Sequence, residues 1–213
     1  MLYSTYGRSY NVIVVISEGS GEDMQLLKDR IIKDGQVIGT GIVKVDSFLN
    51  HQIDVGLIWE IGKEFARRYH GLPVNKILTI ESSGIAVACA TAMHMGNLPV
   101  VFAKKTTPST MTDGYYTTEC ISFTKGTVSS VIVSKKYLTN TDNLLIIDDF
   151  LAHGEAALSL ANLAGQAGAT VSGIGAVIEK AFQGGGEKLK QKGYRVESLA
   201  VITSILDDHI TFK

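Results

Sequence analysis

The chain has 213 residues, of which 45% are hydrophobic, so it is long enough for one α/β domain with a full core and short for two. Its formal net charge at pH 7 is −1, and this balance excludes a general electrostatic attraction to nucleic acid or to an anionic membrane. We therefore expect no nucleic-acid partner. No apolar run reaches the length that spans a membrane, so we expect no membrane partner either.

The segment at residues 1–23 differs from the rest of the chain, and we expect it to be a leader or an appended extension with a tendency to disorder. Residues 12–16 have strand character, although a short apolar run near an N-terminus is also typical of a signal peptide. Glu18 and Asp23 follow this run without a clear cleavage pattern, which argues against secretion. A Gly-Ser-Gly linker at residues 19–21 then leads to a single domain over residues 24–213.

The first half of this domain is predicted to alternate between helices and strands. Asp54 is a suitable N-cap for a helix whose apolar stripe is Ile58, Ile61, Phe65 and Tyr69. In chain order, the pattern predicts a helix over residues 25–33, short strands within 37–45, the helix capped by Asp54, a strand over 76–80, a tight loop at 81–84, a helix over 85–95 and a strand over 100–103.

The second half begins with residues 104–114, which are polar and without periodicity, as is typical of a mobile loop. The pattern that follows predicts two antiparallel strands over residues 115–123 and 128–134 with a turn at Lys125-Gly126, a strand over 144–147, a helix over 155–166 closed by Gly168, a strand over 171–178, a short helix over 184–192 and strands over 195–202 and 209–212. This succession predicts an α/β fold with a parallel sheet covered on both faces, in which ligands bind beyond the carboxyl ends of the strands.

The two cysteines, Cys89 and Cys120, are isolated in the sequence. Neither belongs to a Cys-x-x-Cys pair or has a histidine at metal-ligand spacing, so no metal site is indicated. We expect two buried or half-buried thiols and a cytoplasmic location, because free thiols persist in a reducing compartment.

The strand over residues 144–147 runs directly into two adjacent acids, Asp148 and Asp149. Like charges this close repel each other and resist burial, so we expect a positive or hydrogen-bond-donating ligand beside them. A ribose diol with bound Mg²⁺ meets this need, because carboxylates accept from hydroxyls and from the waters of the metal. The turn that follows, with Gly154 before a helix, offers unpaired backbone N–H groups to a phosphate. Together these features indicate a site for a ribose 5-phosphate.

This order of four apolar residues, two acids and a small-residue turn before a helix resembles the phosphoribosyl pyrophosphate (PRPP) signature of the type I phosphoribosyltransferase family. No P-loop and no dinucleotide-binding glycine motif is present. Residues 43–54, 79–86, 177–180 and 193–200 resemble, more narrowly, the bacterial xanthine phosphoribosyltransferase family, and the resemblance runs from about residue 24 to the C-terminus. It implies a central, mostly parallel sheet flanked by helices, with a small hood built from about residues 37–54 and 180–213.

The resemblance further implies an enzyme of purine salvage that transfers the phosphoribosyl group of PRPP to xanthine, giving xanthosine 5′-monophosphate and pyrophosphate. It implies a homodimer and a Mg²⁺ cofactor that is carried by PRPP and water, with no protein ligand assigned. The positions that match the family's PRPP-binding residues are Glu81, Ser82, Ser83, Gly84, Asp148, Asp149, Ala152, His153, Gly154, Glu155 and Ala156. Catalytic roles are implied for Lys104 and Lys105, which begin a flexible lid, and for the acid pair. Xanthine contacts are implied for Val43, Asn50 and Lys180, and Phe182 is placed to stack on the purine.

Several of these residues have simpler explanations. Asn50 also suits a turn or a cap, Lys180 a solvated strand end, and Phe182 the core. His153 stands where many relatives carry threonine, and Ala152 stands where the hypoxanthine-guanine enzymes carry an acid.

The overall function has alternatives as well. One is transfer to guanine or hypoxanthine instead of xanthine. Another is a non-enzymatic PRPP-binding regulator that binds nucleic acid, and the balanced charge argues against it. A further alternative is that residues 1–23 mediate assembly or targeting.

Overall fold

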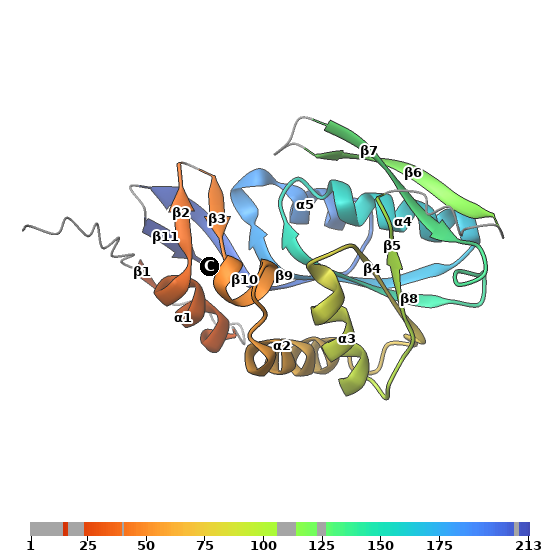
Figure 1. Cartoon of the computed structure of the whole chain (residues 1–213), viewed down its shortest axis with the longest axis horizontal. Helices are drawn as coiled ribbons and strands as arrows, with labels where there is room; N and C mark the ends of the chain where they lie inside the picture. The colour runs from red at the N-terminus through yellow and green to blue at the C-terminus, as the bar shows by residue number, and fades with distance from the viewer. Residues whose placement is uncertain (1–14, 17–23, 40, 106–113, 123–126, 207–208) are drawn as a thin grey trace, which may run out of the picture.

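The computed structural model describes residues 15–16, 24–39, 41–105, 114–122, 127–206 and 209–213. A seven-stranded sheet forms its centre, and helices cover both faces of this sheet (Figure 1). The strands are β1 (Val15–Ile16), β2 (Gln36–Ile38), β3 (Ile42–Lys44), β4 (Lys76–Ile80), β5 (Val100–Ala103), β6 (Tyr115–Ser122), β7 (Thr127–Ser134), β8 (Asn143–Leu151), β9 (Thr170–Lys180), β10 (Val196–Leu206) and β11 (His209–Phe212). The helices are α1 (Gln25–Asp34), α2 (Val55–Arg68), α3 (Gly84–His94), α4 (Glu155–Ala167) and α5 (Gly185–Gln191), with a π-helical turn η1 (Asp46–Asn50) and a 3-10 turn η2 (Ala181–Gln183).

The order of strands in the sheet is β1-β11-β10-β9-β8-β4-β5. Five neighbouring strands, β5, β4, β8, β9 and β10, run parallel to one another, whereas β11 is antiparallel to β10 and β1 is parallel to β11. The pairs β2–β3 and β6–β7 form separate antiparallel ribbons. The prediction of an α/β fold with a central, mostly parallel sheet flanked by helices is confirmed. The predicted hood and domain boundary stay predictions, although β10 and β11 belong to the central sheet.

Strand β8 shows how one apolar run is buried on two faces. Leu145 and Ile147 pack into the core that includes α2 and α3, whereas Leu144 and Ile146 pack into the core that includes α4. Successive side chains of a strand point to opposite faces, so a strand covered on both sides carries a continuous apolar run. Figure 1 shows the same arrangement, with α2 and α3 on one side of the sheet and α4 on the other.

Helix α2 begins where the sequence predicts it. The Asp54 side chain accepts from the Leu57 N–H at 3.1 Å, which is the expected N-cap bond. Near its other end, Phe65 and Tyr69 are fully buried against β9. Glycine makes room for both rings, because a Cβ at Gly173 would lie 3.0 Å from Tyr69 Cδ1 and one at Gly175 would lie 2.7 Å from Phe65 Cε1. The aromatic stripe of α2 therefore needs glycine on the strand beneath it.

The prediction that the strand ends before the two acids is wrong. β8 continues through them to Leu151, and Asp148 pairs with Ala176 while Phe150 pairs with Ile178. The extension has a physical reason, since β9 runs on to Lys180 and offers backbone partners along this whole length. The two acids therefore lie on a strand and not in a loop.

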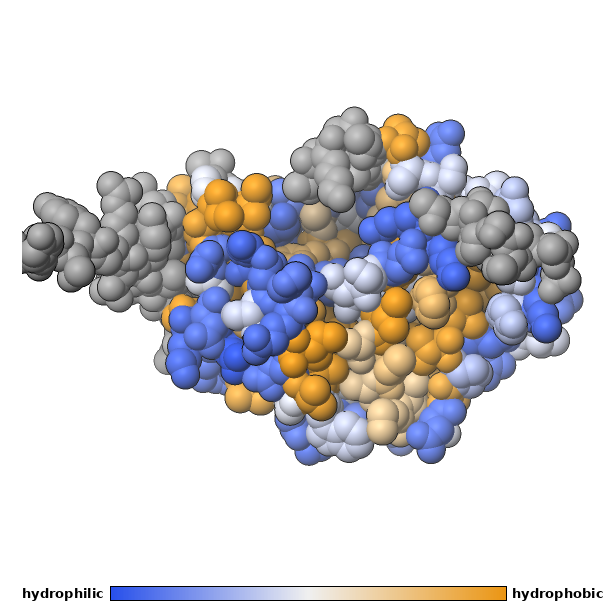
Figure 2. Space-filling model, in the orientation of Figure 1, coloured by the Kyte–Doolittle hydropathy of each residue, from blue (hydrophilic) through white to orange (hydrophobic). Residues whose placement is uncertain are grey.

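The predicted burial of Cys89 is also wrong, because this thiol is exposed, whereas Cys120 is half-buried as expected. Cys89 and Met93 lie four residues apart on α3, so they share the helix face that points away from the core. Met93 is 54% exposed and Phe102 of β5 is 39% exposed. Figure 2 shows a largely apolar surface in the region that α3 and β5 occupy in Figure 1.

Some predicted features fall outside the described residues. Of residues 1–23, only β1 is described, and it pairs with β11, so the nature of this leader stays a prediction. The polar loop is described only at its ends, and the turn at Lys125-Gly126 is not described. Within the described ranges, no helix combines the length and apolar character needed to cross a membrane.

The close crossing of α2 and α3 at Gly62 allows a test of the fold. A Cβ at Gly62 would lie 2.5 Å from the backbone carbon of Ala90 and 2.7 Å from the Thr91 nitrogen. Overpacking of this kind costs about 1–3 kcal/mol, because the clash is with backbone that cannot rotate away. We expect Gly62→Ala to lower the free energy of unfolding by that amount in urea titrations.

Gly165 of α4 supplies the matched control for this substitution. It is exposed, and a Cβ there would meet nothing within 4 Å. Gly165→Ala should raise the free energy of unfolding by up to about 1 kcal/mol, because alanine favours the helix. Equal effects of the two substitutions would contradict the close helix contact.

Candidate active site

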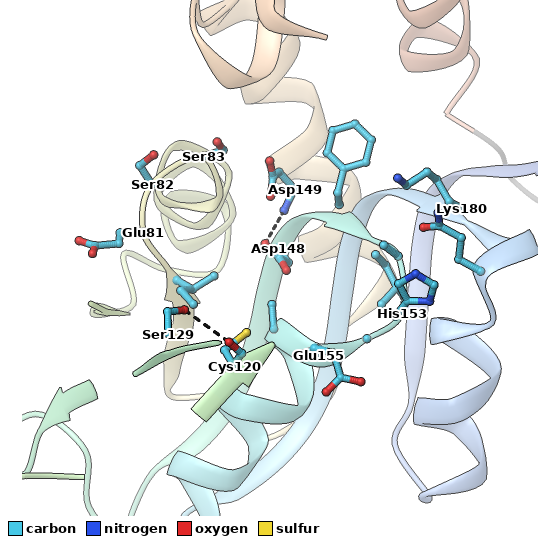
Figure 3. A pocket seen from close by; sticks show the side chains of 18 of the residues that line it. Glu81, Ser82, Ser83, Cys120, Ser129, Asp148, Asp149, His153, Glu155 and Lys180 are labelled. Carbon is cyan, nitrogen blue, oxygen red and sulfur yellow. Dashed lines mark hydrogen bonds between the residues drawn. The ribbon is translucent and has the colours of Figure 1, made fainter. Parts of the chain in front are cut away.

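A cavity of about 680 Å³ lies at the carboxyl ends of β4, β8 and β9 (Figure 3). Its walls come from the β4–α3 loop, the last residues of β8, the β8–α4 loop, the end of β9 and the last residue of η2. The predicted residues that line it are Glu81, Ser82, Ser83, Lys105, Asp148, Asp149, Ala152, His153, Gly154, Glu155, Ala156 and Lys180. Residues from distant parts of the sequence thus meet at the edge of the sheet where a ligand is expected.

Asp148 and Asp149 lie side by side in this cavity (Figure 3). Asp148 is 7% exposed, and its Oδ1 accepts from the Asp149 N–H at 3.0 Å. Burial raises the pKa of Asp148 well above its usual range, and the neighbouring Asp149 carboxylate raises it further, against a smaller opposing effect of Lys105. A bound group that brings donors or positive charge would relieve this unfavourable charge. The acid pair is therefore suited to a ligand rich in hydroxyls or to a cation.

The β8–α4 loop turns the chain from the sheet into α4. Gly154 has φ +83°, a left-handed conformation that glycine adopts without strain. In the described structure no side chain caps α4, so the N–H groups of its first turn and the positive end of the helix are open to an anion. The Glu155 carboxylate bonds to Lys188 Nζ at 2.5 Å and points away from the acid pair in Figure 3, which reduces its repulsion of an anion.

The β4–α3 loop forms a second place for an anion. The Glu81 Oε1 accepts from the Lys105 N–H at 2.6 Å and so ties this loop to the segment that follows β5. The peptide bond between Glu81 and Ser82 is cis. A Cβ at Gly84 would run into the buried hydroxyl of Thr79, so only glycine fits at the start of α3. The Ile85 N–H already donates to the Ser82 carbonyl at 3.2 Å, so the candidate donors to an anion are the backbone N–H groups that precede it in this loop.

Lys180, at the end of β9, lies at the opposite side of the cavity from Glu81 (Figure 3). Its Nζ donates to the Gly41 carbonyl at 3.1 Å and lies 6.0 Å from the centre of the Phe150 ring. Burial lowers the pKa of Lys180. Gln183 also lines the cavity, and its buried Oε1 has no hydrogen-bond partner among the described residues. A donor, an acceptor and an aromatic ring are therefore grouped at this end.

Other predicted site residues do not line the cavity. Val43 is buried in the core, Asn50 is exposed on η1, and Phe182 is 42% exposed on η2. Gly84 is buried beneath its loop, and Lys104 is engaged in a β-bridge to β7. Of the four residues predicted to contact a purine, Lys180 alone lines the cavity.

The cavity also contains residues that the sequence analysis missed as site residues, namely Gly41, Ile42, Ile80, Cys120, Ser129, Phe150, Leu151, Ala157 and Gln183. Phe150 could have been found from its position, because it directly follows the acid pair on the same strand. Cys120 and Ser129 have no recognisable signal in the sequence, since they reach the cavity only through the packing of the β6–β7 ribbon. Long-range packing of this kind has no local pattern in the sequence.

No protein-family model matches the chain. It is 52% identical over 189 residues to the xanthine phosphoribosyltransferase of Ruminiclostridium cellulolyticum, which covers 89% of this chain and 99% of that relative. It is 53% identical over 189 residues to the xanthine phosphoribosyltransferase of Lacticaseibacillus casei, with 89% and 98% covered. The corresponding values for the Clostridioides difficile xanthine phosphoribosyltransferase are 50% over 190 residues, with 89% and 100% covered.

Solved structures agree on the fold. The APRTase of Giardia lamblia, complexed with 9-deazaadenine, has a TM-score of 0.69 at 21% identity and covers 82% of this chain and 96% of its own. The adenine phosphoribosyltransferase of Saccharomyces cerevisiae has a TM-score of 0.67 at 18% identity, with 83% and 99% covered. At this level of identity the likeness establishes the phosphoribosyltransferase fold alone.

The raised pKa of Asp148 predicts that the charge of this carboxylate lowers the stability of the folded protein, although the same charge suits the cavity to a ligand. A carboxyl whose pKa is higher in the folded protein favours folding when protonated, so stability falls as the pH rises from the unfolded pKa of about 3.9 through the folded pKa. Asp148→Asn keeps the shape and removes the charge, so we expect the free energy of unfolding at pH 7 to rise by about 0.5–2 kcal/mol. Urea titrations at several pH values would measure this change and its loss in acid.

Asp142 supplies the contrasting control, because it is also buried but is paired. Its Oδ1 lies 2.7 Å from Lys76 Nζ, and its Oδ2 accepts from the Thr139 N–H at 2.8 Å. Asp142→Asn should therefore lower the free energy of unfolding at pH 7 by about 1–3 kcal/mol. A comparable loss for Asp148→Asn would show that the charge of Asp148 is not unfavourable in the folded protein.

Proposed function

The chain belongs to the xanthine phosphoribosyltransferase family, and we propose that its cavity transfers the 5-phosphoribosyl group of PRPP to xanthine, giving xanthosine 5′-monophosphate and pyrophosphate. Besides the sequence identity to these relatives, one structural observation supports the proposal. A single cavity combines an acid pair of which Asp148 is buried, two helix starts suited to anions, and a half-buried lysine beside an aromatic ring. These parts correspond to the ribose, the phosphate groups and the base of the two substrates.

The acid pair is proposed to bind the ribose of PRPP. Asp148 and Asp149 would accept hydrogen bonds from the two ribose hydroxyls, and the 5′-phosphate would lie on the loop from Ala152 to Gly154 at the start of α4. The pyrophosphate would lie at the β4–α3 loop, where backbone N–H groups of Ser82 and Ser83 are candidates to donate to it. This placement is supported by the positions of the acid pair and the two helix starts around one cavity.

The reaction is expected to pass through a ribosyl oxocarbenium with pyrophosphate departing. The acid pair would stabilise positive charge on the sugar, while Lys105 and the loop N–H groups would stabilise negative charge on the leaving group. Lys104 is proposed to belong to the lid, although it is not one of the residues that line the cavity. Closure of the segment that begins there would exclude water, which otherwise hydrolyses the sugar cation.

The cavity fits Mg²⁺ that arrives with PRPP. Among the described residues no group of three or more His, Cys, Asp or Glu side chains gathers as a metal site. Mg²⁺ needs no such cage when it is held by one or two carboxylates, water and substrate phosphates, and Asp148 with Asp149 fits that donor set. When bound, the ion would neutralise charge on the departing pyrophosphate.

Xanthine is proposed to bind at the Lys180 end of the cavity. Lys180 Nζ is a donor for a carbonyl oxygen of the base, and the unpaired Gln183 Oε1 is an acceptor for a ring N–H. Phe150 is better placed than Phe182 to stack on the purine, because its ring lines the cavity. Contacts from Val43 and Asn50 rest on the family resemblance alone.

The proposal also covers the oligomeric state of the protein and its cellular compartment. We expect a homodimer, as the resemblance implies, and the exposed Met93 and Phe102 are candidates for burial in its interface. Cys89 and Cys120 are free thiols, which suits the reducing cytoplasm.

Turnover of three bases tests the proposed function. The full chain is assayed with PRPP and Mg²⁺ and with xanthine, guanine or hypoxanthine in turn. We expect kcat/KM for xanthine to exceed that for the other two by at least about tenfold, because a site that hydrogen-bonds a given carbonyl rejects bases that lack it. Preference for guanine or hypoxanthine would support the alternative function instead.

The matching control removes the ribose contacts. The double variant Asp148→Asn with Asp149→Asn should lose about a hundredfold or more in kcat/KM, since each charge-assisted hydrogen bond is worth about 1.5–3 kcal/mol. Thermal denaturation would show the variant to be folded, so the loss could not be attributed to unfolding. Full activity of this variant would refute the ribose assignment.

Lys180 is tested by a substitution that keeps its length. Lys180→Met should raise KM for xanthine by about 10- to 100-fold and leave KM for PRPP nearly unchanged, because it removes a charged donor to the base. Lys190→Met is the control, since Lys190 lies on the exposed side of α5 with Glu187 as its partner at 3.1 Å. An unchanged KM for xanthine in Lys180→Met would place the base elsewhere.

A further inference from the structure

The start of α5 lies directly against the β8–α4 loop. The Gly185 N–H donates to the Ala152 carbonyl at 3.0 Å. A Cβ at Gly185 would run into the Ala152 carbonyl oxygen and would lie 2.7 Å from the Gly154 nitrogen and 2.9 Å from the His153 carbonyl carbon. All three atoms belong to the backbone of the loop, so no side-chain rotation could make room.

From the side of the loop, a side chain at Gly154 would meet α5 at ordinary van der Waals distances. A Cβ at Gly154 would lie 3.4 Å from the Gly185 carbonyl oxygen, 3.5 Å from its Cα and 3.7 Å from Leu189 Cγ. Leu189 is fully buried, which fixes α5 in the core that contains α4. Two glycines therefore let two backbones meet without intervening side chains, and the position of one determines the position of the other.

Two further contacts hold α5 in place. The buried Glu179 carboxylate accepts from Ser198 Oγ at 2.6 Å, and a Cβ at Gly186 would run into this carboxylate. On the other side, Lys188 Nζ lies 2.5 Å from Glu155 Oε1, at the first residue of α4. The helix thus packs closely against the Glu179 carboxylate of the central sheet and forms an ion pair with the first residue of α4.

We propose that Gly185 is a positioning residue for the phosphate loop, and that the start of α5 holds this loop in its binding geometry from behind. The inference rests on the proposed function, in which residues 152–154 receive the 5′-phosphate of PRPP. Because a trans peptide places its C=O and N–H on opposite sides, the bond from Gly185 to the Ala152 carbonyl turns the His153 N–H away from α5. The loop geometry is then set by a residue that does not itself line the cavity.

Gly185→Ala tests this role directly. The added methyl group must push the loop and α5 apart, and a misplacement of about 1 Å in a binding site can cost a hundredfold. We expect KM for PRPP and the Kd for ribose 5-phosphate to rise about tenfold or more, with KM for xanthine little changed. Steady-state kinetics and titration calorimetry with ribose 5-phosphate on the full chain measure these quantities.

Gly173→Ala controls for a loss of stability alone. A Cβ there would run into the buried Tyr69 ring, at the opposite end of β9 from Lys180. This variant should melt at a lower temperature than wild type but keep its KM for PRPP and its Kd for ribose 5-phosphate. Gly165→Ala, in which the new methyl group meets nothing within 4 Å, should not lower the melting temperature and should leave KM for PRPP and the Kd for ribose 5-phosphate unchanged. A rise in KM for PRPP in Gly173→Ala equal to that in Gly185→Ala would overturn the proposal.

Lys188→Met gives a second test that adds no bulk, in case Gly185→Ala does not fold. It removes the ion pair with Glu155 and should raise the Kd for ribose 5-phosphate by about two- to fivefold. Wild-type Kd in Lys188→Met, or wild-type KM and Kd in a folded Gly185→Ala, would overturn the positioning role.

Ribose 5-phosphate binding separates this inference from the proposed function. Binding without transfer to xanthine in the wild type would refute the function, and the Kd of the variants would still decide the role of Gly185. Absence of binding in the wild type would overturn both.

Discussion

The site depends on one constraint, which is that a buried carboxylate, Asp148, and a half-buried one, Asp149, lie side by side near the end of β8. Asp148 and Asp149 repel each other, and burial raises the cost of charging Asp148. The strand that carries them is held by β4 and β9 and is packed on both faces, so apolar contacts offset a local charge that is unfavourable without ligand. In the proposed function, the ribose hydroxyls of PRPP would donate to the two carboxylates and so reduce the free-energy cost of their charge.

Close backbone contacts arrange the loops around this pair. Gly84 approaches Thr79 at the start of α3, and Gly154 meets Gly185 where the β8–α4 loop packs on α5. A methyl group on Gly84 or on Gly185 would clash, so packing requires glycine at both positions, whereas Gly154 needs glycine for its positive φ. The loops therefore take their shape from the elements behind them, and the sheet and α5 act as a rigid support for the ligand.

Much of the fold was predictable because its signals are local. The apolar runs of β4, β8 and β9 and the capped stripe of α2 have periods that depend only on neighbours in the chain. The end of β8 was not predictable in the same way, since its extension through the acids depends on pairing with β9. Exposure of Cys89 was missed for a similar reason, because it depends on which face of α3 meets α2.

The ribose and phosphate end of the proposed site was predictable from the sequence, because Asp148, Asp149 and Gly154 lie in one continuous segment. Tertiary structure decided the rest. It brought Lys105 but not Lys104 to the cavity, and it placed Phe150 there in preference to Phe182. The physical reason is that the direction of a side chain and the partner of a backbone are set by elements that are distant in sequence, and a linear pattern does not contain that information.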